Sequence, residues 1–173
     1  MSDLIVVAFR SEAAATAARN ALLALQQAAG TEPEDIILVT RTGAGQITLD
    51  QSTWLATGLP LGGGRWGMLI GSLFLDDRKP TKQSKKGLAA LFRKAGLDAA
   101  FLQDVSQSLD SGGTALGMRV RKLGAKAVLD RLASLPETGM VMHRALSADV
   151  ESDFEALHDV IPEYVPRHLR QDE

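Results

Sequence analysis

The first part of the chain has an apolar run followed by a helical repeat of alanine and leucine. The run, residues 4–9, is too short for a solvent-facing helix and predicts a central strand buried on both faces. A helix is expected next, because apolar residues recur at helical spacing from Ser11, a good N-cap, to Gly30, which ends it. The stripe expected to face the sheet consists of Ala14, Ala18, Ala21, Leu25 and Ala28.

Two short strands follow the first helix, and a comparable strand–helix–strand unit occurs near the C-terminal end of the chain. Residues 36–42 predict a second strand, which the glycine-rich turn 43–45 joins to a short third strand over residues 46–50. Further along, a strand over residues 114–121, a helix and a strand over residues 139–145 form a comparable βαβ unit. The apolar face of that helix contains Ala125, Val128, Leu129 and Leu132.

Two interleaved βαβ halves predict the α+β class and a ferredoxin-like two-layer sandwich, in which helices cover one face of an antiparallel sheet. A last helix, capped by Ser147, is expected to pack on this body. Within one domain, the expected segments are a first half with its hairpin strand (1–50), a Gly-rich and basic helical insertion (51–113), a second half with the last helix (114–161) and an acidic tail (162–173).

The insertion has a Gly-rich apolar part, residues 61–75, and ends in two predicted helices that separate near Gly96, the second capped by Asp98. Glycines four residues apart line one face of a helix and let another backbone approach closely. The expected helix-packing or oligomer contacts are Gly63, Gly67, Gly71 and the neighbouring Trp66. The alternative is a loop and a short helix buried in the protein's own core.

Four stretches of the chain resemble one bacterial family. They are DLIVVAF at the start, GLPLGGGRWGMLIGSLFL, GTALGMRVRK and the Ser-Ala-Asp-Val opening of the last helix, and together they span roughly residues 3–158. They are similar to the family catalogued as domain of unknown function 1269. Its members are often described as membrane proteins, so the resemblance implies membrane association. It implies no reaction and no functional residue.

The chain departs from the family pattern after the Gly-rich stretch. Typical members continue into a second Gly/Ala-rich apolar segment, whereas residues 76–86 here are mostly charged, so the second half of an apolar hairpin is missing. The remaining window, residues 61–75, would be about 22 Å long as a helix, which is shorter than the hydrocarbon core of about 30 Å, and it contains Arg65. A helix that is buried or packs in an oligomer is therefore favoured over a transmembrane span.

The formal net charge of −2 hides two charged regions. Residues 76–94 hold seven basic and two acidic residues, and residues 147–173 hold eight acidic and two basic ones. The expected contacts to an anionic surface are Arg78, Lys79, Lys82, Lys85, Lys86, Arg93 and Lys94. The helix around Phe92 is either a basic amphipathic helix that meets lipid or, as we favour, a core-facing helix beside a solvated loop. A third interpretation is contact between this basic arm and the acidic C-terminal region of a neighbouring subunit.

Composition argues against several kinds of chemistry. The absence of cysteine excludes disulfides, thiolate metal sites and cysteine nucleophiles. The near-neutral charge and the single aromatic near the basic run argue against nucleic acid as a partner. The GxGxxG at residues 62–67 lacks the preceding strand and the later acidic residue of a dinucleotide site, so no cofactor is expected. No metal is expected either, because His143, His158 and His168 lack ligand spacing.

These observations predict a non-enzymatic structural or interaction domain that associates with itself in the cytoplasm. The alternative is a peripheral, less readily integral, membrane protein on the cytoplasmic face, which would use the Gly-rich segment and the basic helix to bind an anionic membrane surface.

Overall fold

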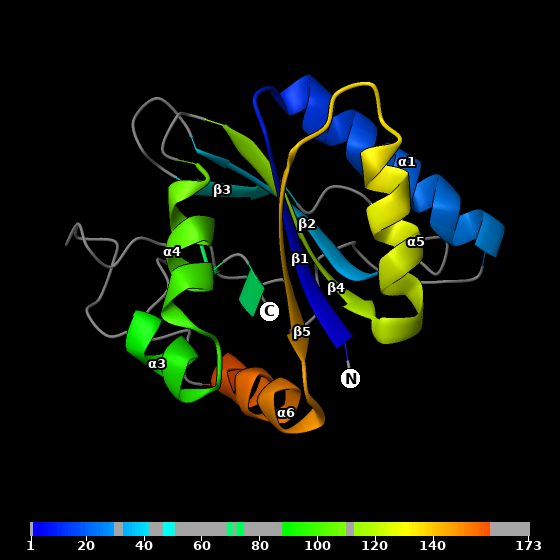
Figure 1. Ribbon diagram of the computed structural model, residues 1–173. Coiled ribbons are helices and arrows are strands. Elements are labelled where there is room, and N and C mark those ends of the chain that lie inside the picture. The colour runs from blue at the N-terminus through cyan, green and yellow to red at the C-terminus, as the bar shows by residue number, and fades with distance from the viewer. Residues whose placement is uncertain are drawn as a thin grey trace.

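The fold is built on one five-stranded sheet. The computed structural model describes residues 2–29, 33–41, 47–50, 69–70, 72–74, 88–109 and 113–159. Its strands are β1 (Ser2–Phe9), β2 (Pro33–Arg41), β3 (Ile47–Asp50), β4 (Thr114–Arg121) and β5 (Met140–Leu146). They lie in the order β3-β2-β4-β1-β5 (Figure 1), and every neighbouring pair is antiparallel.

Two βαβ units interleave in this sheet. The helix α1 (Glu12–Ala29) connects β1 to β2, and α5 (Lys122–Ala133) connects β4 to β5. Because β1 and β2 both run antiparallel to the intervening β4, each unit joins two parallel strands with a strand of the other unit between them. The predicted α+β class and ferredoxin-like sandwich are confirmed, with β3 added at one edge by the predicted hairpin.

Helices also cover the second face of the sheet. In Figure 1, α1 and α5 lie on one side of the sheet, and α3 (Leu88–Lys94), α4 (Ala99–Gln107) and α6 (Ala148–Ala156) lie on the other. The short 3-10 helix η1 (Leu157–Asp159) follows α6. The insertion and the last helix therefore add a third layer to the predicted two-layer unit.

The local signals in the sequence identify several element boundaries. The predicted strand over residues 114–121 is β4, and the four other predicted strands differ from β1, β2, β3 and β5 by one to three residues at one or both ends. All three predicted N-caps are confirmed. The Ser11 and Ser147 hydroxyls accept from the backbone N–H of Ala14 at 3.1 Å and of Val150 at 3.3 Å, and the Asp98 carboxylate accepts from that of Phe101 at 2.7 Å. Gly96 separates α3 from α4 with a φ of 110°, a conformation that favours glycine.

The buried stripe of α1 differs from the predicted one. Ala15, Ala18 and Leu22 are fully buried, while Ala14, Ala21 and Leu25 are only partly buried. The helix is rotated slightly from the expected phase, because many of its residues are alanines and alanine alone does not mark which side faces the core.

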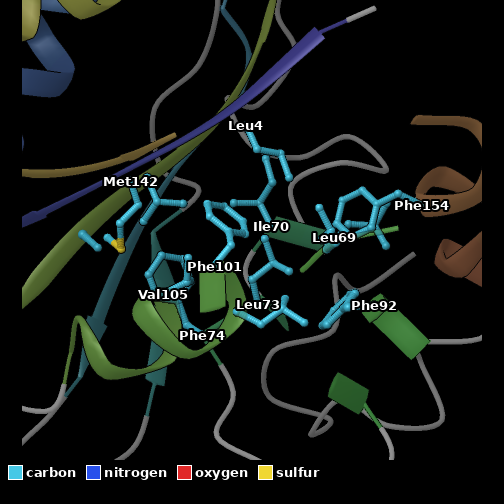
Figure 2. Close-up of a cluster of buried hydrophobic side chains, with 14 of the residues drawn as sticks. Leu4, Leu69, Ile70, Leu73, Phe74, Phe92, Phe101, Val105, Met142 and Phe154 are labelled. Carbon is cyan, nitrogen blue, oxygen red and sulfur yellow. The ribbon is translucent and has the colours of Figure 1, made fainter. Parts of the chain in front are cut away.

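Each face of the sheet has its own apolar core. On β1, Leu4 and Val6 point into the core under α3, α4 and α6, while Ile5, Val7 and Phe9 point into the core under α1 and α5. The predicted burial of this strand on both faces is confirmed. Figure 2 shows the first of these cores, where Leu69, Ile70, Leu73 and Phe74 of the insertion meet side chains from the sheet, α3, α4 and α6.

Candidate functional site

The predicted contact residues of the insertion are described only in part. Gly63, Trp66, Gly67 and Gly71 lie outside the described residues, as do Arg78, Lys79, Lys82, Lys85 and Lys86. Arg93 and Lys94 are described, and both are exposed at the end of α3.

The described part of the Gly-rich segment packs against the sheet of its own chain. Leu69, Ile70, Leu73 and Phe74 are at most 2% exposed, and all four belong to one core cluster with residues of β1, β2 and β4. A glycine, Gly117, makes room for this packing: a Cβ built there would lie only 2.3 Å from Cγ2 of Ile70. These apolar side chains are therefore used within the chain.

The apolar face of α3 also packs into the core of its own chain. Phe92 is 2% exposed and Ala95 5% exposed, and the rings of Phe92 and Phe154 have their centroids 5.6 Å apart. The interpretation of this segment as a core-facing helix is confirmed for these residues. In the part of the chain that the structure describes, no helix combines the length and apolar character needed to cross a membrane.

An exposed edge strand is the main feature left for contact with a partner. Among the described strands, β3 and β5 each have a neighbour on one side only, and the neighbour of β5 is β1. Its register with β1 is continuous and it contains no proline, so its outer edge is a regular row of backbone groups of the kind to which another strand can add. Figure 1 shows β5 at the front, with α4 and α5 on opposite sides of it.

The side chains along this strand combine apolar and polar groups. We call its five exposed residues the β5 edge surface: Met140, Val141, His143, Arg144 and Ala145. Met140 is 56% exposed and Val141 43% exposed, and these are the large hydrophobic residues that the described part of the chain leaves in solvent. Exposed apolar side chains beside an open strand edge are typical of an interface.

A buried carboxylate holds the histidine of this surface. His143 Nε2 lies 2.6 Å from Oδ1 of Asp3 on β1, and the Asp3 side chain is only 7% exposed whereas that of His143 is 38% exposed. This contact holds the imidazole of β5 against the neighbouring strand β1. His143 lies on an edge strand, and its link to Asp3 depends on the β1–β5 register, which no local motif reveals.

A second carboxylate holds the arginine on the opposite face of the strand. The Arg144 guanidinium lies 2.5 Å from Oδ2 of Asp98 and 5.6 Å from the ring centroid of Phe101. Asp98 thus caps α4 with one oxygen and binds β5 with the other. Both basic side chains of the β5 edge surface have an acidic partner within the chain.

A third polar group fixes α6, which follows β5. The Arg119 guanidinium on β4 pairs with Glu151 on α6, and Arg119 Nε donates to the Ser2 hydroxyl at 3.3 Å. Burial alone would raise the pKa of Glu151, but nearby positive charge, including Arg119, lowers it by more, so the pKa lies below its ordinary value. The ion pair therefore favours the ionised carboxylate and ties the helix to the sheet.

Comparison with known proteins gives a family. Residues 60–158 match the model of the family described as "Protein of unknown function (DUF1269)", and this match covers more than half of the chain. The chain therefore belongs to this family, as the sequence resemblance implied. Neither the curated proteins nor the solved structures include one that matches it.

Proposed function

We propose that this member of the DUF1269 family is a non-enzymatic interaction domain that associates with itself, and that the copies meet at the β5 edge surface. The observation that carries the proposal is the open, regular edge of β5 with Met140 and Val141 exposed on it. Strand edges of this kind pair readily with another chain unless charge, proline or a bulge protects them.

The surroundings of the edge support contact with another protein rather than catalysis. His143 and Arg144 each contact a carboxylate of the same chain, so both side chains are held in place before a partner binds. Fixed side chains lose little conformational entropy on binding. A partner would gain backbone hydrogen bonds along β5 and bury two apolar side chains.

The described residues of the Gly-rich segment pack within the chain. Its described residues Leu69, Ile70, Leu73 and Phe74 lie in the core, so they hold the sheet and the third layer together rather than presenting an apolar face to a neighbour. Because these four side chains are buried, we place the proposed self-association at the β5 edge surface instead.

Sedimentation of the purified chain over a range of concentrations tests the proposal. We expect the native chain to form dimers or larger species, and Val141→Lys to shift it toward monomer, because a lysine on an edge strand opposes pairing. Ala13→Lys adds the same charge at an exposed position of α1 and serves as the matched control, which should associate like the native chain. A native chain that stays monomeric at the highest concentration contradicts the proposal.

Peripheral membrane binding is the weaker candidate. Phe92 and Ala95 are buried, so neither is available for lipid, whereas the described basic residues Arg93 and Lys94 are exposed. Such binding would be electrostatic and would weaken as salt is added. Co-sedimentation with anionic vesicles at low salt tests it, and an unbound protein under those conditions would remove this candidate.

A further inference from the structure

We propose that two copies pair β5 with β5 in an antiparallel arrangement, with His143 at the two-fold axis, so that their sheets join into one. This inference rests on the proposed self-association and specifies its geometry. An isologous contact uses the same surface on both copies, so the surface must complement itself. An antiparallel strand edge meets this condition because its donors and acceptors match those of its own copy.

The length of β5 selects the register. In a two-fold antiparallel pair within one sheet, facing residues lie on the same face, so they differ by an even number of positions. Centring the pair on His143 brings all seven residues from Met140 to Leu146 opposite a residue of the partner strand. Centring it on Met142 leaves Ala145 and Leu146 outside the ladder, and the proposed register therefore makes the longer set of backbone hydrogen bonds.

Side-chain size supports the same register. With His143 at the axis, the exposed Val141 faces Ala145 of the partner subunit, and Ala145 of the first copy faces Val141 of the partner subunit. A bulky side chain thus meets a small one at both ends of the contact. In the register centred on Met142, Val141 would face the imidazole of the partner's His143, and Met140 would face the guanidinium of the partner's Arg144.

Charge does not oppose a second copy in this register. Each His143 beside the axis has its imidazole 2.6 Å from the carboxylate of Asp3 on β1. Each Arg144 lies on the other face of the sheet with the carboxylate of Asp98 beside it. On the same side, the exposed part of α4 next to Asp98 begins with Ala99 and Ala100, which carry no charge. A copy therefore meets compensated charge rather than an unpaired cation.

Cysteine cross-linking tests the register, because the chain has no cysteine of its own. Facing residues of antiparallel strands have Cα atoms about 4.5–5.5 Å apart, which is within the range of a disulfide. We expect mild oxidation to link His143→Cys to itself. The matched control is Lys126→Cys on α5, whose side chain is 86% exposed and lies outside the β5 edge surface. The linked fraction of the first should exceed that of the control by about tenfold or more, since contact raises the effective concentration of the thiols.

Cross-linking in a mixture of two variants tests directly which residues of the two β5 strands face each other. Val141→Cys mixed with Ala145→Cys should form the mixed disulfide, and each alone should link poorly, because four residues along a strand separate like positions by about 13 Å. All three β5 positions are exposed, and unchanged thermal melting verifies that each variant folds.

The outcomes separate the two proposals. Association of the native chain together with this linking pattern supports the register. Association without linking at position 143 and without the mixed disulfide overturns the register alone and leaves self-association standing. A native chain that remains monomeric, with linking no greater than that of Lys126→Cys, overturns both.

Discussion

Replacing Gly117 with alanine should push the insertion away from the sheet. Gly117 lies on β4 between Val6 of β1 and Ile37 of β2, which face it in the two ladders. Because Gly117 has no side chain, Ile70 of the insertion fits over the middle of the sheet, where it is completely buried. Figure 2 shows Ile70 in the middle of this core.

The contact distances give the expected size of the effect. A Cβ at position 117 would lie 2.3 Å from Cγ2 of Ile70, well inside the 3.5–4.0 Å at which carbon atoms pack best, and 3.4 Å from Cγ2 of Ile37. Overpacking of this kind costs about 1–3 kcal/mol. Alanine is favoured over glycine within a strand by about 0.5–1 kcal/mol, which offsets part of that cost. We expect Gly117→Ala to lower the free energy of unfolding by about 1–2 kcal/mol.

A double-mutant cycle measured by urea denaturation tests this reasoning. Ile70→Ala alone should cost about 2–5 kcal/mol, because it leaves a cavity, but it also removes the Cγ2 that the new methyl group meets. The double variant should therefore be no less stable than Ile70→Ala, which gives a coupling of about 1–3 kcal/mol.

The control for this cycle lies on the opposite face of the sheet. Leu132→Ala truncates a residue of the core under α1 and α5, and its effect should add to that of Gly117→Ala. If the effects of Gly117→Ala and Ile70→Ala also add, then Ile70 does not occupy the space over Gly117 and the description of the insertion is wrong.

Two further predictions concern the polar contacts. Asp98→Ala removes both the cap of α4 and the partner of Arg144, and should cost about 1–2 kcal/mol in thermal denaturation, whereas Asp98→Asn keeps an acceptor at the cap and should cost less than half of that; equal losses would contradict the capping role. The pKa of Glu151 is lowered in the folded state, so the carboxylate contributes stability that is present above the ordinary carboxyl pKa and is lost as the pH falls through the lowered value. Glu151→Gln should thus be less stable than the native chain near pH 7 and equal to it well below about pH 4, and a difference that stays constant with pH would refute this linkage.

The sequence predicts the parts of the fold that depend on local signals. A few adjacent residues are enough to predict the limits of β4, the helix caps Asp98 and Ser147, and the break between helices at Gly96. The phase of α1 is less well marked, because its alanines differ little from one face to the other. The pairing of His143 with Asp3 could not be predicted, since it joins residues 140 positions apart through the order of the strands.

The insertion lies where it does because both faces of the apolar strand β1 must be covered. The continuous apolar run of β1 predicts burial on both faces, but α1 and α5 can cover only one of them. The remaining face must then be covered by the apolar residues of the insertion and of the last helix, which is where Leu69, Phe74 and Phe154 lie. These three buried side chains are therefore not available to a neighbour. In contrast, β5 is one of the two edge strands of the described sheet and buries only Met142 and Leu146, so it keeps exposed side chains and a strand edge for a partner.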